Sequence, residues 1–154
     1  MTKHSAGLLM YRCRGDRVEV FLVHPGGPFW VNKDLGAWSI PKGEFEPPEE
    51  ALSAAQREFE EETGFKARGP FISLTPVRQK NGKIVDAWAC EGDCDPADLK
   101  SNMFAMEWPL HSSRRQEFSE VDRAGWFGLE EAGRKILPGQ SAFLEELSKL
   151  IGQA

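Results

Sequence analysis

The stretch Gly43–Phe65 reads GEFEPPEEALSAAQREFEEETGF and predicts one well-defined helix. Pro48 suits the first helical turn, because its missing N–H has no partner to lose there. Glu49 and Glu50 complement the positive end of the helix dipole. Gly64 is a typical C-terminal stop, so we expect the helix to end just before it. The apolar positions that share one face at helical spacing, and that we expect to be buried, are Leu52, Ala55 and Phe59.

The second half of this helix concentrates carboxylates. Glu58, Glu61 and Glu62 stand at i, i+3 and i+4, so they project toward one region beside the apolar face. The like-charged pair Glu58 and Glu62 destabilises an isolated helix by roughly 0.2–0.5 kcal/mol, and negative charge near the C-terminus opposes the dipole. A solvated acidic face is one interpretation of such a charge run. A bound divalent cation is the other, and Mg²⁺ prefers such oxygen ligands.

The spacing of the fixed residues decides between these interpretations. The pattern is Gly, five residues, Glu, seven residues, then Arg-Glu-apolar-any-Glu-Glu-any-Gly-apolar, and it resembles the Nudix box without exception. A chance match in a chain of this size is on the order of one in ten million. The fixed positions are Gly43, Glu49, Arg57, Glu58, Phe59, Glu61, Glu62, Gly64 and Phe65. The chain also resembles bacterial Nudix proteins described only as predicted nucleoside triphosphate pyrophosphohydrolases.

The resemblance implies a fold and a set of ligands. We expect the α+β class, as a Nudix α/β/α sandwich with a mixed β-sheet, in a single domain over residues 1–154 with the box at 43–65. Glu58, Glu61 and Glu62 would bind Mg²⁺, with Mn²⁺ as a substitute, and the backbone carbonyl of Gly43 would add a ligand. Arg57 would orient the glutamates through ion pairs. Glu49 would support the site or join the outer metal shell.

The resemblance leaves the general base open. Glu58 is one candidate. Many Nudix proteins carry a further acidic residue several positions before a Trp that begins the last strand, and Glu120 stands six residues before Trp126. Glu120 fits this description better than Glu117, so we expect it in the catalytic and metal-binding set. A surface-loop acid is the alternative interpretation.

Substrate contacts are indicated more weakly. The sequence Pro41-Lys42-Gly43 leading into the box resembles the Nudix branches that hydrolyse dinucleoside polyphosphates or inositol pyrophosphates. Lys42 would then place a charge on a substrate phosphate. Trp30 and its neighbour Phe29 would stack on a nucleobase, or else be buried. Arg114, in the pair with Arg115, would hold a further phosphate, or else be an ordinary surface arginine.

Outside the box, alternating apolar residues and turn signals predict strands, and amphipathic spacing predicts helices. Arg14-Gly15-Asp16 and Asn81-Gly82 are hairpin signals. Strands are expected at 6–12, 18–24, 38–40, 71–78, 84–90 and 124–127. Helices are expected at 129–136 and 141–151, an irregular segment with one short turn at 92–102, and mostly loop at 103–120.

Composition and charge limit the classes of binding partner that we expect. With 154 residues, 40% hydrophobic content and a formal charge of −5, the chain suits one globular domain rather than a nucleic-acid-binding surface. It shows no signal-peptide pattern and no apolar run of about 20 residues, so we expect a cytoplasmic protein without membrane contact. The expected partner is a small nucleotide or polyphosphate, bound by a monomer or homodimer. The alternative to a Nudix hydrolase is a Nudix-fold nucleotide-sensing or regulatory module. A simple cation-binding protein is disfavoured because no EF-hand pattern is present.

Overall fold

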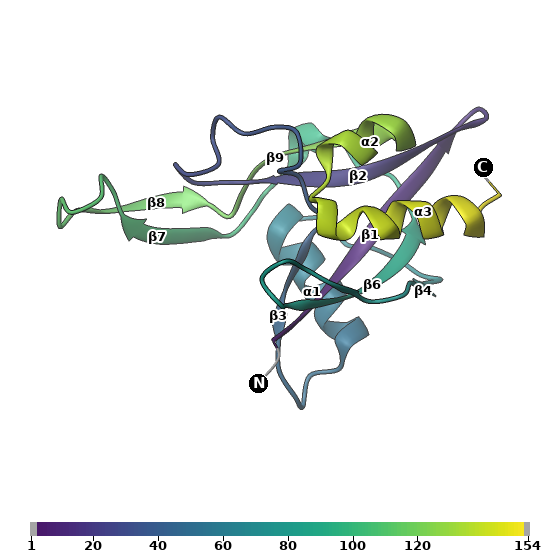
Figure 1. The fold of residues 1–154 in the computed structure, drawn as a ribbon, viewed down its shortest axis with the longest axis horizontal. Coiled ribbons are helices and arrows are strands. Elements are labelled where there is room, and N and C mark those ends of the chain that lie inside the picture. The colour runs from purple at the N-terminus through teal and green to yellow at the C-terminus, as the bar shows by residue number, and fades with distance from the viewer. Residues whose placement is uncertain (1–2, 153–154) are drawn as a thin grey trace.

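The computed structural model describes residues 3–152. The first two and the last two residues of the predicted 1–154 domain therefore lie outside the described residues. A seven-stranded sheet lies between two helical layers (Figure 1). Its strands are β1 (His4–Arg14), β2 (Arg17–Pro25), β3 (Lys42–Phe45), β4 (Ile72–Ser73), β5 (Val77–Arg78), β6 (Ile84–Glu91) and β9 (Val121–Gly128). A separate two-stranded sheet pairs β7 (Met103–Glu107) with β8 (Arg115–Ser119). The helices are α1 (Ala51–Thr63), α2 (Leu129–Lys135) and α3 (Ser141–Leu150), with 3-10 turns at Pro96–Asp98 and Pro138–Gln140.

The central strand of the sheet is β1. It runs parallel to β6 and antiparallel to β2, and the order β4-β6-β1-β2-β9 therefore makes a mixed sheet, as expected. On the side opposite β6, the first residues of β1 pair with β3 and its last residues pair with β2. This arrangement makes β3, the strand that begins the box, part of the sheet, beside the first residues of β1.

Alternation along β1 builds two separate cores, one on each face of the sheet. Leu8 belongs to the core that contains Phe59 of α1. Leu9, the next residue, belongs to the core that contains Phe143 of α3 and Ala132 of α2. All five side chains are fully buried. The predicted α/β/α sandwich is confirmed, with α1 on one face and the two C-terminal helices on the other.

The predicted start of the box helix is wrong by three residues. The helix α1 begins at Ala51, and Glu50 is its N-cap in an extended conformation. Pro48 lies in a preceding turn, which the N–H of Glu49 closes by donating to the carbonyl of Glu46. Glu49 does not serve the helix dipole, because its carboxylate binds Arg57 instead. The predicted end is confirmed, since Gly64 adopts φ 81° and caps the helix.

Three other expectations need correction. The segment 103–120 is a β-hairpin and not a loop, with Phe104 paired to Phe118 across its two strands. The segment 38–40 forms only isolated bridges, Ser39 with Val23 and Trp38 with Ile136. The expected strand 71–78 is two short strands separated by residues 74–76. The other strands and helices form where they are predicted, within a few residues. Within residues 3–152, no helix has the length and apolar character needed to span a membrane.

Candidate active site

The carboxylate of Glu62 points from α1 toward the start of β3. Its Oε1 atom accepts a hydrogen bond from the backbone N–H of Lys42 at 3.3 Å. Burial raises the pKa of Glu62 to about 8, against the lowering effect of that hydrogen bond. Repulsion from the neighbouring carboxylates of Glu58 and Glu120 contributes to this raised pKa. Glu58, Glu62 and Glu120 are therefore close enough to interact electrostatically, as the sequence predicts.

Glu58 lies against the backbone of β3 at Gly43. A Cβ atom at this glycine would overlap the Glu58 carboxylate carbon and both of its oxygens. Burial raises the pKa of the Glu58 carboxyl, while the charge of Arg57 opposes the shift. The glycine of the box is thus required by space, because the carboxylate fills the position of a side chain.

Arg57 holds three carboxylates in place. Its Nε and Nη2 atoms donate to Glu49 at 2.7 and 2.9 Å, forming a bidentate pair. Its Nη1 atom donates to Glu61 at 2.8 Å and to Glu58 at 3.3 Å. The bonds to Glu49 and Glu61 raise the pKa of Arg57 well above its ordinary value. The ion pairing expected of Arg57, and the supporting place expected of Glu49, both appear in the geometry.

The three box glutamates do not converge on one point. Glu61 turns toward Arg57, whereas Glu62 turns toward the N–H of Lys42. Within residues 3–152, no group of three or more acidic, His or Cys side chains is arranged as a metal site. Glu58 lies between the other two, since it touches Arg57 and interacts with Glu62.

Glu120 joins this group from outside the box, at an exposed position. It links β8 to β9, and two backbone hydrogen bonds fix its position: its N–H donates to Asn102, and its carbonyl accepts from Gly26. Its neighbour Glu117 is exposed in β8, opposite Ala105. The structure therefore brings Glu120 to the box carboxylates and leaves Glu117 on the hairpin.

A cavity of about 200 Å³ lies where these elements meet. Glu62 and Glu120 line it together with Lys42 and Trp30. Burial lowers the pKa of Lys42, and the charge of Lys83 adds to this effect. Trp30 is 36% exposed, and the ammonium group of Lys33 lies 5.3 Å from the centre of its ring. One expected positive group and one expected aromatic ring thus share a cavity with two of the carboxylates.

The structure does not bring Arg114 to this cavity. Arg114 lies in the turn that connects β7 to β8, at the end of the hairpin farthest from β9 (Figure 1). It is exposed, and its N–H is bound by the hydroxyl of Ser112.

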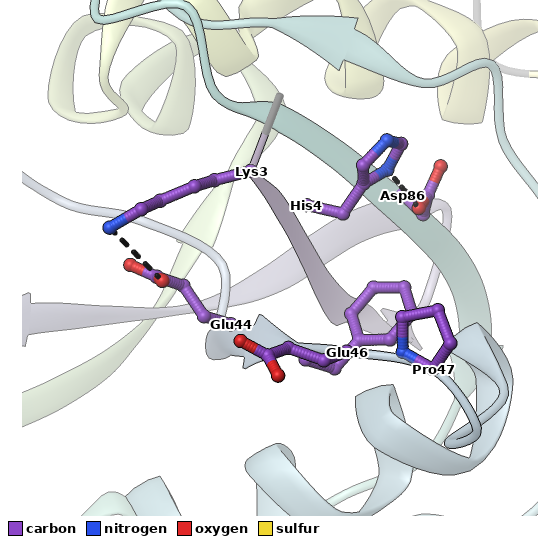
Figure 2. Close-up of a pocket in the computed structure, with 7 residues that line it drawn as sticks. Lys3, His4, Glu44, Glu46, Pro47 and Asp86 are labelled. Atoms are coloured by element: carbon purple, nitrogen blue, oxygen red, sulfur yellow. Dashed lines mark hydrogen bonds and ion pairs between the residues drawn. The ribbon is translucent and has the colours of Figure 1, made fainter. Parts of the chain in front are cut away.

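A larger cavity of about 750 Å³ lies near the start of β1 (Figure 2). Most of the charged or titratable residues in its lining form pairs, namely His4 with Asp86 and Lys3 with Glu44. His4 Nδ1 lies 3.2 Å from Asp86, and Lys83 donates to Glu44 at 2.8 Å. Lys3 is a further cation near Glu44, at 3.9 Å. The smaller cavity differs from this larger one in being lined by Glu62 of the box and by Glu120.

Sequence reasoning missed a buried histidine that connects two walls of the smaller cavity. His24, at the end of β2, is fully buried. Its Nδ1 lies 2.8 Å from Asp122 of β9, and its Nε2 lies 2.6 Å from the carbonyl oxygen of Lys33. The ring also stands edge-on to Trp38 at 5.2 Å. A histidine at the end of an apolar strand gave no signal of this role, because its partners are 9 and 98 residues away.

Comparison with known proteins places this geometry in a family. The family model of the NUDIX domain matches residues 1–147. The chain belongs to the Nudix family. Every carboxylate of the Nudix box is present in its sequence.

Solved Nudix structures share the fold. A Caenorhabditis elegans Ap4A hydrolase, in a binary complex, matches with a TM-score of 0.67 at 20% identity, covering 97% of this chain and 99% of that one. The NUDIX domain of Shewanella oneidensis NrtR, complexed with ADP ribose, matches with a TM-score of 0.62 at 16% identity, covering 98% and 88%. An RNA pyrophosphohydrolase of Erythrobacter litoralis is 53% identical over 36 residues, which are 23% of this chain and 22% of that relative. The match therefore spans about a fifth of the curated relative.

Proposed function

We propose that this Nudix protein hydrolyses a phosphoanhydride bond in a nucleoside diphosphate linked to another group, in a Mg²⁺-dependent reaction. The observation that carries the proposal is the shared cavity of Glu62, Glu120, Lys42 and Trp30. It combines carboxylates for a metal, a cation for phosphate and an aromatic ring for a base. No other cavity described within residues 3–152 joins these groups to the box.

The donor set fits a hard divalent cation. Glu58 and Glu62 are carboxylates whose burial disfavours their charge, and Glu120 adds negative charge beside them. An oxygen-ligated Mg²⁺ would compensate this charge, with Mn²⁺ as a substitute. Glu58, Glu62, Glu120 and the carbonyl of Gly43 would hold it, and Glu61 would join by turning away from Arg57. The chemistry that Mg²⁺ supplies when bound is neutralisation of the charge on the phosphoryl oxygens.

The chain's own residues supply the remaining steps. Lys42 would bind a phosphate oxygen from inside the cavity, where its side chain is partly buried. Glu120 would accept a proton from the attacking water, with Glu58 as the alternative base. Trp30 would stack on the nucleobase, a contact that contributes about 1–3 kcal/mol in other nucleotide-binding proteins.

Dinucleoside polyphosphates are the first substrate class to test, and nucleoside triphosphates the second. Support comes from the Pro41-Lys42-Gly43 sequence and from the fold shared with an Ap4A hydrolase. The RNA pyrophosphohydrolase match adds a nucleotide polyphosphate of another kind. The alternative function is a nucleotide-sensing module without strong catalysis. Such a module would bind nucleotides without turning them over.

A substrate screen tests the proposal. The full chain is incubated with dinucleoside polyphosphates, nucleoside triphosphates, nucleotide sugars and inositol pyrophosphates, and the products are identified. Turnover should require Mg²⁺ or Mn²⁺ and disappear with chelator. Glu61→Gln and Glu62→Gln should each lower kcat by orders of magnitude, whereas Glu60→Gln, at an exposed position of the same helix, should not. Nucleotide binding without cleavage in the wild-type protein would support the sensing module instead.

A further inference from the structure

Exposed apolar side chains gather on one part of the molecule. Among residues 3–152, six of the eight large hydrophobic side chains that are exposed lie in two short segments. These six, Phe29, Trp30, Val31, Leu35, Met103 and Leu110, have exposed fractions of 36–69%. A cluster of exposed apolar side chains marks a surface for a ligand or partner more often than single ones do. We call the two segments, 29–35 and 103–110, the outer wall.

Aromatic contacts hold the two segments of the outer wall together. The rings of Phe29 and Trp108 meet edge to face, with centroids 5.5 Å apart and planes at 82°. Close by, a Cβ atom on Gly27 would come within 3.0 Å of the Phe104 ring, so the loop lies directly on the hairpin. Within residues 3–152, the two strands of the hairpin pair with each other and with no strand of the main sheet. The loop contact therefore fixes its orientation.

The outer wall begins at the catalytic cavity. Trp30 belongs to both, because it lines the cavity and neighbours Phe29. The hairpin also reaches the cavity, since Glu120 directly follows β8. The loop and the hairpin both extend beyond the main sheet at one end of the molecule (Figure 1). A substrate that leaves the cavity past Trp30 would pass along the outer wall.

The size of the cavity indicates that part of the substrate must leave it. Sites that enclose a drug-sized ligand have volumes of about 300–1,000 Å³. The catalytic cavity, at about 200 Å³, is smaller than this range. It has room for the reacting phosphates and their immediate neighbour, but not for a whole dinucleoside polyphosphate. The second nucleoside of such a substrate must lie outside.

We propose that the outer wall binds the second nucleoside, the one beyond the phosphate chain, with its base against the exposed face of Phe29 and Trp108. This inference rests on the proposed function and adds a specificity determinant to it. A nucleobase suits this surface, because every base offers a flat apolar face for aromatic side chains. The ammonium of Lys33 lies beside Trp30, where the phosphate chain would pass from the cavity to the outer wall.

Two substrates that differ only in the second nucleoside test the inference. Diadenosine tetraphosphate carries it, and adenosine 5′-tetraphosphate does not. The wild-type enzyme should show a KM about ten-fold lower for the diadenosine compound, as one base stack predicts. Trp108→Ala should raise that KM about ten-fold and leave kcat, and the KM for adenosine tetraphosphate, within two-fold. Leu150→Ala, at a 49% exposed position of α3, is the matched control and should change neither KM.

A milder variant keeps the test informative if Trp108→Ala disrupts the fold of the hairpin. Phe29→Leu keeps apolar bulk but removes the aromatic face, and it should produce the same selective rise in KM. Equal KM values for the two nucleotides in the wild-type enzyme would refute the second-nucleoside site while leaving the proposed function intact. Cleavage of neither nucleotide would refute both. A 5′-triphosphorylated RNA with a far lower KM than either would assign the outer wall to RNA and overturn the proposal.

Discussion

The Glu58 carboxylate fills the space that a side chain on Gly43 would need. The backbone of Gly43 is not in the left-handed region, so glycine is required here by contact and not by conformation. Glu58 in turn touches Arg57 and repels Glu62. The approach of α1 to β3 therefore sets the positions of the box carboxylates relative to one another.

Gly43→Ala should abolish most activity. The added methyl group would push the Glu58 carboxylate away from β3, and misplacing a reacting group by about 1 Å can lower a rate about 100-fold. We expect kcat to fall at least about 100-fold at saturating Mg²⁺, with a folded protein by circular dichroism. Gly133→Ala is the matched control, because a Cβ atom there meets nothing within 4 Å. Similar activity in the two variants would show that the Glu58 position is not critical.

Arg57→Ala should lower kcat without unfolding the protein. Arg57 binds Glu49, Glu58 and Glu61 at once, so its loss releases two candidate metal ligands. Removing residues that orient metal ligands costs about 10–100-fold in metal affinity or activity. The measurement is kcat as a function of Mg²⁺ concentration. Arg134→Ala removes an exposed i,i+4 pair with Glu130 and should leave the Mg²⁺ dependence unchanged.

Glu120→Gln should impair turnover more than Glu117→Gln. Glu120 lines the catalytic cavity, whereas Glu117 lies on β8 and does not line it. If Glu120 accepts the proton of the attacking water, kcat should fall by about 100-fold or more. The slope of kcat against pH should change as well, which the loss of a structural contact would not produce. Equal and mild effects of the two substitutions would remove Glu120 from the active site.

The box helix and the two-layer core were predictable because their signals are local. Leu52, Ala55 and Phe59 repeat at helical spacing, and the structure buries the last two and partly buries the first. The orientation of the carboxylates was not predictable from spacing. Glu61 and Glu62 are adjacent in sequence, yet one binds Arg57 and the other binds a backbone N–H 20 residues away.

The hairpin was missed for a related reason. Its strands, MFAME and RQEFS, contain no β-branched residue, so strand propensity gives little signal. Contacts that only the fold supplies stabilise it, namely the pair Phe104 and Phe118 and the pair Phe29 and Trp108. The same fold-dependent contacts create the outer wall, which sequence analysis therefore did not predict.

Glu62 should make the metal-free protein less stable as the pH rises. The pKa of Glu62 is about 8 when folded, against an ordinary value of 4.5. The folded state thus holds this proton more tightly than the unfolded chain. Stability from this group is complete below about pH 4.5 and is lost as the pH rises toward 8.

Glu62→Gln removes this titration, so the variant should gain melting temperature relative to wild type between pH 5 and pH 8. We expect a relative gain of several degrees, measured by thermal unfolding in chelator. Added Mg²⁺ should reverse the order at pH 8 by stabilising the ionised wild-type site. Glu60→Gln, at an exposed position, is the control. A Glu62→Gln gain that does not vary with pH would contradict the burial argument.

His24→Leu should loosen the loop that carries Trp30. Both ring nitrogens of His24 face oxygen acceptors, the carboxylate of Asp122 and the carbonyl of Lys33. Leucine fills similar space but removes the polar contacts of this buried ring, and the loss of such a hydrogen bond costs about 0.5–1.5 kcal/mol. We expect a lower melting temperature and faster amide hydrogen exchange confined to residues 26–36. The exposed pair of His4 with Asp86 offers a matched control, since His4→Leu breaks a histidine–aspartate contact in which the His4 side chain is 43% exposed. Such exposed pairs contribute about 0–1 kcal/mol. If His4→Leu had as large an effect as His24→Leu, the burial of His24 would not be what holds the loop.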